Sequence, residues 1–179
     1  DEDIRQRIGE PLGPMLAALF DVDGELLQQL VTDYSTAYVE GTATMERPFA
    51  DTLSLLKALR GDGRKLAIAT GKSQNGADHA TRRMGLAPYF DSIHGIIPGT
   101  PGKPHPAVLQ RAMAALGVSA DQAIMIGDTT FDMDLSAAIG VDAVAVSWGV
   151  HSVDVLRSRN PRVVVNDMTE LLDWLRTHT

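Results

Sequence analysis

The alternation of apolar and polar positions from residue 50 onward predicts a regular series of helices and strands. Segments with apolar residues at helical spacing indicate helices, and short runs rich in Ile, Val and Ala indicate buried strands. The expected strands are 65–70, 92–97, 123–128, 143–149 and 162–165. The expected helices are 50–63, 73–85, 104–117, 131–140, 153–159 and 168–177. Apolar strands separated by helices imply a three-layer α/β fold, in which helices cover both faces of a parallel sheet.

The first part of the chain has a different pattern. Residues 1–20 and 24–41 favour helix and contain no convincing strand. We therefore expect a small helical module in residues 1–46, followed by an α/β core in residues 47–179 that lacks a clear first strand.

Composition excludes several classes of function. The chain has 179 residues and a net charge of −7, which argues against a broad nucleic-acid-binding surface. No apolar run approaches the roughly 20 residues of a membrane span, so no membrane partner is expected. The chain contains no cysteine, which excludes disulfides and thiolate metal sites and fits a reducing cytoplasm. We expect a cytoplasmic monomer or homodimer.

Polar residues that could take part in catalysis lie at or after the ends of the predicted strands. Thr70 ends one strand, and Asp128 ends another with Asp132 four residues later. Lys103 lies between them in a Gly/Pro loop before a helix. Ligands of parallel sheets bind at the carboxyl ends of the strands, so we expect these side chains to gather there. Carboxylates can hold Mg²⁺, and a lysine and a hydroxyl can bind phosphoryl oxygens.

Three stretches carry a resemblance to a known family. In order, "IATGKS", "GKPHP" and "MIGDTTFDM" resemble three of the four motifs of the haloacid dehalogenase (HAD) superfamily, closely those of its phosphoglycolate phosphatase-like branch. The resemblance extends over nearly the whole chain, and "IRQRIGEPLGPMLAALF" looks like the family's helical cap. It implies a HAD-like three-layer Rossmannoid parallel sheet with a small helical cap at the N-terminal end of the chain.

The resemblance also implies an activity and residue roles. The expected function is Mg²⁺-dependent hydrolysis of a small phosphate monoester through an aspartyl-phosphate, with phosphoglycolate as the default substrate. Thr70, Lys103 and Asp128 would be catalytic. The substrate, a small phosphorylated metabolite, would be bound by Thr70, Gly71, Lys72 and Lys103, and Mg²⁺ by Asp128 and Asp132. Alternatives are a pseudo-phosphatase that binds a phosphorylated ligand without turnover, and a phosphomutase on the same scaffold.

The stretch "FDVDGELL" (20–27) resembles the family's fourth motif, Asp-x-Asp-Gly-Thr, which follows the first strand and contains the nucleophile. Asp21 and Asp23 match its two acids, whereas Glu25 stands in place of Thr. The preceding "PMLAALF" has no β-branched residue and favours helix. We therefore favour a polar turn between two cap helices, with Gly24 supplying its flexibility.

The location of the nucleophile stays open between two alternatives. In the family, the nucleophile strand lies between the strands of Thr70 and Asp128, and its omission would leave buried backbone groups unpaired. Either residues before Asp1 supply this strand, or "MLAALFD" (15–21) forms it despite poor propensity. The missing initiator Met favours the first alternative. On that reading the 179-residue chain alone holds the cap and four site residues but no nucleophile, and would be inactive by itself.

Overall fold

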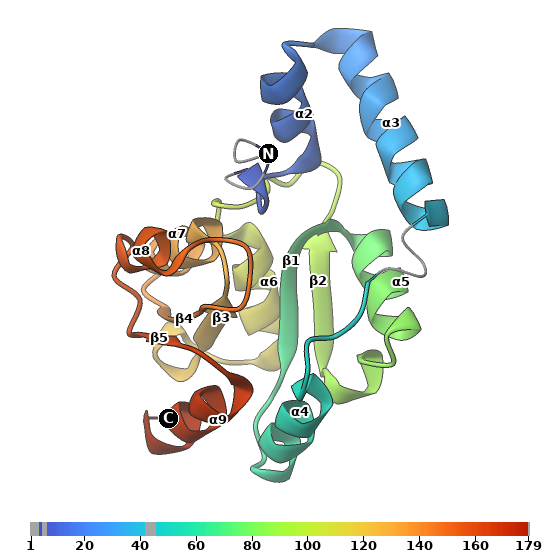
Figure 1. The fold of residues 1–179 in the computed structure, drawn as a ribbon. Coiled ribbons are helices and arrows are strands. Elements are labelled where there is room, and N and C mark those ends of the chain that lie inside the picture. The colour runs from blue at the N-terminus through green and yellow to red at the C-terminus, as the bar shows by residue number, and fades with distance from the viewer. Residues whose placement is uncertain (1–3, 5–6, 42–45, 179) are drawn as a thin grey trace.

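The computed structural model describes residues 4, 7–41 and 46–178, and the predicted features at 1–3, 5–6, 42–45 and 179 lie outside the described residues. Its N-terminal part is a helical hairpin of α2 (Leu12–Phe20) and α3 (Gly24–Gly41). This hairpin stands beyond the ends of the strands of the α/β part (Figure 1). No described helix combines the length and the apolar character needed to cross a bilayer.

The stretch "FDVDGELL" is the turn of this hairpin. Helix α2 ends at Asp21, whose left-handed backbone (φ 53°) lets its N–H donate to the Ala17 carbonyl. Asp21 and Asp23 are both exposed. The predicted turn between helices is confirmed. The alternative that residues 15–21 form a strand is wrong, because the backbone hydrogen bonds of Met15–Phe20 close within a helix of good helix formers.

The α/β part follows the predicted order of elements. Its strands are β1 (Ala67–Ser73), β2 (Ser92–Ile96), β3 (Ile124–Gly127), β4 (Asp142–Val146) and β5 (Val163–Val165). Its helices are α4 (Thr52–Gly61), α5 (Gln74–Arg83), α6 (Ala107–Leu116), α7 (Thr130–Ala137), α8 (Val153–Arg157) and α9 (Met168–His178), with short 3₁₀ turns at Ala87–Tyr89 and Ala120–Gln122. The predicted ends have local causes. Ser73 caps α5 by accepting a hydrogen bond from Gly76 N–H at 3.2 Å. Gly117 ends α6 in a left-handed conformation (φ 64°).

The strands are parallel, as predicted, but the described residues form two sheets. One sheet has the order β1–β2 and the other β3–β4–β5. In the described residues, no strand pairs with β1 or β3 on the edge between them, which is the position where the sequence left open a further strand. Both edges therefore present backbone groups to which a further strand could pair.

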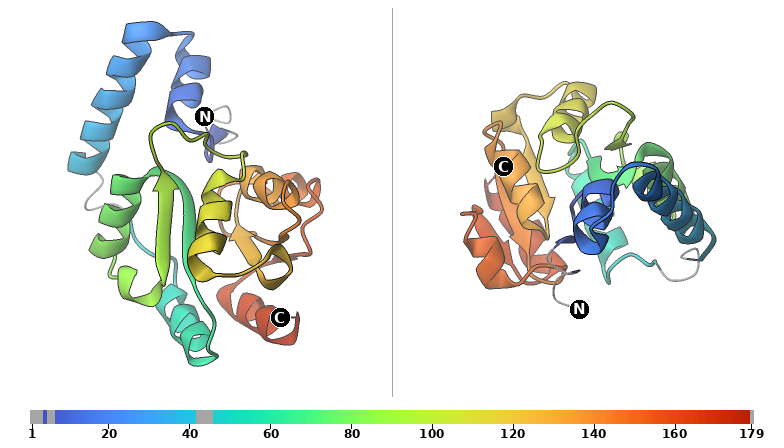
Figure 2. Two further views of the ribbon diagram at one scale, coloured as in Figure 1. Left: turned by 180° about the vertical axis from the view of Figure 1, so that it is seen from behind. Right: turned by 90° about the horizontal axis from the view of Figure 1, so that it is seen from above.

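Helices cover both faces of the larger sheet, which gives three layers (Figure 2). On one face, Leu55 and Leu59 of α4 and Leu171 of α9 pack with Val144 and Val165 of the sheet. On the other face, α6 and α7 contribute Leu109 and Leu135, which pack around Met125 of β3. This core fixes the carboxyl end of β3, where Asp128 follows.

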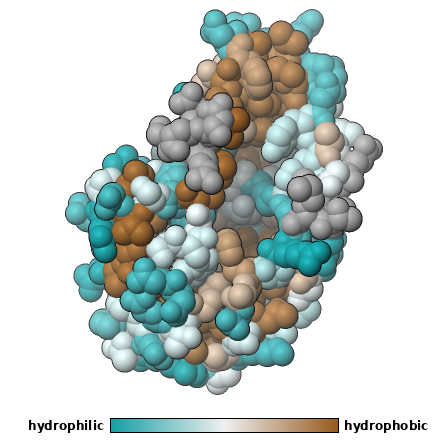
Figure 3. Space-filling view, viewed as in Figure 1, coloured by the Kyte–Doolittle hydropathy of each residue, from teal (hydrophilic) through white to brown (hydrophobic). Residues whose placement is uncertain are grey.

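The helical hairpin buries much less apolar surface than the core. Leu16 is the buried residue of α2, whereas Phe20, Leu26 and Tyr34 are 62%, 57% and 46% exposed. Figure 3 shows apolar side chains gathered on the surface of the hairpin. The residue that precedes α2, Pro11, lies close to the α/β core. A Cβ added to Gly102 would lie 2.4 Å from Cγ of Pro11, so the start of the hairpin packs on the loop that carries Lys103.

Candidate active site

A buried ion pair forms the centre of the candidate site. Lys103 Nζ lies 2.5 Å from Asp132 Oδ1, and the two side chains are only 8% and 7% exposed. Lys103 comes from the loop before α6, and Asp132 from the first turn of α7. Each charge compensates the burial of the other, so the pair holds the loop of Lys103 and the start of α7 in a fixed relation.

Thr129 fixes the second oxygen of Asp132. The Thr129 hydroxyl donates to Asp132 Oδ2 at 2.8 Å, and it also caps α7 by accepting from the Asp132 backbone N–H. Asp132 is therefore held by two partners, Lys103 and Thr129. Its carboxylate is directed at the lysine in this structure, and its predicted role as a metal ligand stays a prediction.

Asp128 is held by the loop that follows β4. Its Oδ2 accepts a hydrogen bond from the Val150 N–H at 2.9 Å, and its carbonyl accepts from the His151 N–H at 3.2 Å. The neighbouring Gly149 leaves room for this carboxylate, because a Cβ at that position would lie 2.2 Å from Asp128 Oδ2. The His151 ring adds a further contact, since its Nδ1 accepts from the Thr130 N–H at 3.0 Å. The loop 149–151 thus orients the acidic end of β3.

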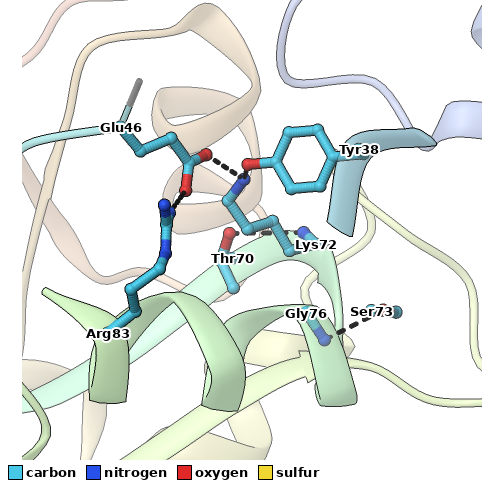
Figure 4. Close-up of polar contacts among 7 residues, drawn as sticks. All are labelled: Tyr38, Glu46, Thr70, Lys72, Ser73, Gly76 and Arg83. Carbon is cyan, nitrogen blue, oxygen red and sulfur yellow. Dashed lines mark hydrogen bonds and ion pairs between the residues drawn. The ribbon is translucent and has the colours of Figure 1, made fainter. Parts of the chain in front are cut away.

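Thr70 and Lys72 lie at the carboxyl end of β1. The Thr70 hydroxyl oxygen accepts a hydrogen bond from the Lys72 backbone N–H at 3.2 Å. The Lys72 side chain extends toward the hairpin, where its Nζ contacts Tyr38 of α3 and Glu46 (Figure 4). Thr70, Gly71 and Lys72 therefore lie on a different sheet from the strand that Asp128 follows, whereas Lys103 lies on the Asp128 side, paired with Asp132. The Lys72 side chain contacts the hairpin and Glu46.

The segment around Gly9 connects the two halves. A Cβ on Gly9 would lie 2.7 Å from the Phe131 ring and 3.1 Å from Thr129 Oγ1. A Cβ on Gly71 would lie 3.5 Å from the Gly9 carbonyl oxygen. This segment thus touches both the residue after Thr70 and the turn after Asp128, which places the carboxyl ends of β1 and β3 around one location.

The described residues fit a magnesium ion only in part. Asp128 Oδ2 accepts from Val150, while Oδ1 accepts no hydrogen bond within the described part of the chain. In the same residues, no three His, Cys, Asp or Glu side chains are grouped closely enough to hold a metal ion. Asp128 can therefore serve as one oxygen ligand, and a complete Mg²⁺ site needs further oxygen ligands.

Sequence reasoning missed several residues of the site. The pattern Thr129-x-x-Asp132 is a helix-capping signal that could have identified Thr129. Gly149, Glu46 and Tyr38 carry no such signal, because their partners are more than twenty residues away along the chain. Asp21 and Asp23 lie at the tip of the hairpin and have no part in this arrangement (Figure 1).

Comparisons with known proteins identify relatives over most of the chain. The family model described as "Haloacid dehalogenase-like hydrolase" matches residues 1–146. The probable phosphatase IndB of Dickeya dadantii (strain 3937) is 33% identical over 175 residues, which cover 94% of this chain and 75% of that protein. The phosphoglycolate phosphatase of Rhodospirillum rubrum is 30% identical over 182 residues, covering 96% of this chain and 75% of that protein.

Solved structures agree with this assignment of the fold. A predicted phosphatase from Clostridium acetobutylicum superposes with a TM-score of 0.90 at 24% identity, covering 98% of this chain and 82% of that chain. A haloacid dehalogenase-like hydrolase from Streptococcus pneumoniae superposes with a TM-score of 0.86 at 26% identity, covering 97% and 80%. The family resemblance and the α/β fold inferred from the sequence are confirmed.

Proposed function

Because the chain belongs to the haloacid dehalogenase-like hydrolase family, we propose that it serves as an Mg²⁺-dependent phosphatase of a small phosphate monoester. The buried Lys103–Asp132 pair beside Asp128 is the observation that carries this proposal. A phosphoryl group passes through a transition state with charge spread over its oxygens, and a fixed cation in a poorly solvated site stabilises that charge. The relatives named as phosphatases support the same reaction class.

Lys103 supplies the fixed positive charge. Its ammonium group has three donor hydrogens, and Asp132 accepts one of them. No other acceptor among the described residues takes the remaining two hydrogens, which are left for phosphoryl oxygens or for the attacking carboxylate. Asp132 acts through Lys103 as a positioning residue, and Thr129 in turn orients Asp132. This shell holds the ammonium group in place before substrate arrives, so little reorganisation is needed in the reaction.

Thr70, in β1, and Asp128, which follows β3, would bind the phosphoryl group and the metal ion from the two different sheets. The Thr70 hydroxyl and the nearby backbone N–H groups would bind phosphoryl oxygens without adding charge. Asp128 would hold Mg²⁺ together with oxygen ligands from outside the described residues, and the ion when bound would neutralise negative charge on the phosphoryl group. The loop 149–151 keeps the Asp128 carboxylate directed for this task.

We place the nucleophilic aspartate on a strand that the described residues do not supply. The unpaired edges of β1 and β3 support this placement, because one further parallel strand could pair with both sheets. Such a strand would end between Thr70 and Asp128. Its terminal carboxylate would be near the phosphoryl site and could serve as a second oxygen ligand for Mg²⁺.

The test is Mg²⁺-dependent phosphate release from an aryl phosphate, measured for the 179-residue chain and for the full natural protein. In the full natural protein, where we expect turnover, Asp128→Asn should abolish it. The matched control Asp134→Asn should retain it, because Asp134 lies on α7, the helix that follows Asp128, and forms a surface ion pair with Arg159 at 3.0 Å. Equal rates for the two variants would contradict the role of Asp128.

The same assay tests the nucleophile. We expect Asp21→Asn to leave turnover unchanged, and we expect activity only in protein that contains the additional strand. Loss of activity in Asp21→Asn would show that the hairpin turn is catalytic after all. Mg²⁺ binding without phosphate release in the full protein would instead indicate a pseudo-phosphatase.

A further inference from the structure

His151 is a buried polar residue that has no part in the phosphoryl chemistry described above. It lies in the loop that follows β4 and is 8% exposed. Burial of a polar side chain costs free energy unless its donors and acceptors find hydrogen-bond partners. The two ring nitrogens of His151 meet this requirement differently.

The Nδ1 atom has a fixed partner. It accepts a hydrogen bond from the Thr130 backbone N–H at 3.0 Å, at the start of α7. A ring nitrogen that accepts a hydrogen bond carries no proton, so the ring proton is on Nε2. The Phe131 ring lies beside the imidazole, with 6.2 Å between the ring centroids. His151 therefore presents one hydrogen-bond donor, the Nε2–H group.

This Nε2–H group is buried without a partner. Within residues 4, 7–41 and 46–178, no atom accepts a hydrogen bond from it. Most buried polar groups of folded proteins are paired, and an unpaired donor keeps the full cost of its desolvation. An unpaired donor beside a candidate active site has a physical explanation if a bound ligand supplies the acceptor.

The imidazole lies against the turn that joins β3 to α7. The His151 backbone N–H donates to the Asp128 carbonyl at 3.2 Å, and the ring accepts from Thr130. Thr129 lies between these two residues, and its hydroxyl donates to Asp132 at 2.8 Å. The turn that His151 contacts thus carries both the proposed metal ligand and the carboxylate of the buried ion pair.

We propose that His151 is a substrate-binding residue whose Nε2–H donates a hydrogen bond to an oxygen of the bound phosphate ester. This proposal rests on the phosphatase function proposed above and adds an uncharged donor to that site. Because Nδ1 is held by the start of α7, the donor is in place before the substrate arrives, and binding requires little reorganisation. The donor also adds no positive charge beside the Mg²⁺ that Asp128 would hold.

The test replaces the two ring nitrogens separately. The Asn side chain has an oxygen near the position of Nδ1 and no group at Nε2, whereas the Gln side chain has an amide nitrogen near Nε2 and no acceptor near Nδ1. In the full natural protein, we expect His151→Asn to weaken binding of inorganic phosphate about tenfold, the size of a lost hydrogen bond to a charged group. His151→Gln should retain more of the phosphate affinity and unfold at lower urea concentration, because the Thr130 N–H loses its acceptor.

The affinity for Mg²⁺ alone separates contact with the substrate from an indirect effect through Asp128. Isothermal titration calorimetry measures both affinities. His151→Asn should leave Mg²⁺ binding nearly unchanged, because the Val150 N–H still donates to Asp128 Oδ2. His79→Asn is the control, since His79 is an exposed histidine of α5 and should change neither affinity. Undiminished phosphate binding in His151→Asn, or an equal loss of Mg²⁺ and phosphate affinity, would overturn the proposal.

A spectroscopic measurement tests the wild-type protein without turnover. If that protein releases no phosphate from an aryl phosphate, the phosphatase function fails, and phosphate binding still tests His151. The NMR resonances of the ring nitrogens should show the proton on Nε2, and saturation with inorganic phosphate should shift Nε2 more than Nδ1. A proton on Nδ1, no shift of Nε2 at saturation, or no phosphate binding at all would overturn the assignment of His151.

Discussion

The polar residues of the two sheets are held in different ways. On the β3 side, Lys103 and Asp132 are 8% and 7% exposed and find their partners within the α/β core. On the β1 side, Lys72 and Glu46 are 37% and 26% exposed, and Tyr38 of the hairpin completes their contacts. The first arrangement is fixed by core packing, whereas the second depends on where the hairpin lies.

Apolar packing shows the same contrast. Residues 143–146 of β4 are all buried, and Val144 and Ala145 have no exposed surface. In β1, residues 67–72 are only partly buried. The difference teaches that packing of the α/β core holds the Lys103–Asp132 side, whereas contacts with the helical hairpin hold the Lys72 side.

The strongest test of this contrast is the removal of one lysine from each side. Lys103→Met leaves Asp132 buried without its cation, and we expect a loss of about 3–5 kcal/mol in the free energy of unfolding. Lys72→Met removes a partly exposed ion pair and should cost about 0–1 kcal/mol. Urea denaturation at pH 7 measures both.

A second change tests whether Lys103→Met acts through the buried carboxylate. The double variant Lys103→Met/Asp132→Asn removes the unpaired charge and should be more stable than Lys103→Met alone. Similar losses of unfolding free energy for Lys103→Met and Lys72→Met would contradict the view that the Lys103 side is held more firmly than the Lys72 side.

A smaller effect is expected where the loop after β4 meets Asp128. In Gly149→Ala, the new Cβ would lie 2.2 Å from Asp128 Oδ2, so the carboxylate or the loop must move. We expect a cost of about 1–3 kcal/mol and loss of Mg²⁺-dependent turnover. Gly61→Ala is the control, because nothing lies within 4 Å of its Cβ position at the end of α4, and it should be neutral or slightly stabilising. Full activity in Gly149→Ala would show that the position of Asp128 is less constrained than the structure indicates.

The smallest effect concerns pH and the β1–β2 sheet. Burial, with a further contribution from the Arg111 charge, lowers the pKa of His94 in β2 below its usual value of 6.5. The unfolded chain then binds a proton more readily than the folded one, so His94 lowers stability as the pH falls through 6.5 toward its folded pKa. His94→Asn should flatten the decline in unfolding free energy between pH 7 and pH 5. An unchanged slope would contradict this.

Much of the fold could be predicted from local patterns. The order of helices and strands, the start of a helix at residue 73 and the end of another at residue 117 depend on residues a few positions apart, and these were predicted correctly. The pattern also predicted that "FDVDGELL" is a turn between helices, because the preceding residues have helix propensity. In this fold class, the carboxyl ends of parallel strands lie at the same edge of the sheet. Thr70, Lys103 and Asp128 could therefore be chosen as candidate site residues from the sequence alone.

The sequence by itself thus determined the elements, the family and the residue types available for phosphoryl chemistry. Only the tertiary structure decided that Asp132 faces Lys103, that the described strands form two sheets, and that Glu46 joins Lys72 to Arg83. The physical reason is the separation along the chain of the residues that interact. Helix caps and apolar periodicity are set by neighbours along the chain, whereas ion pairs between residues 26 to 37 positions apart depend on how loops and the hairpin pack in space.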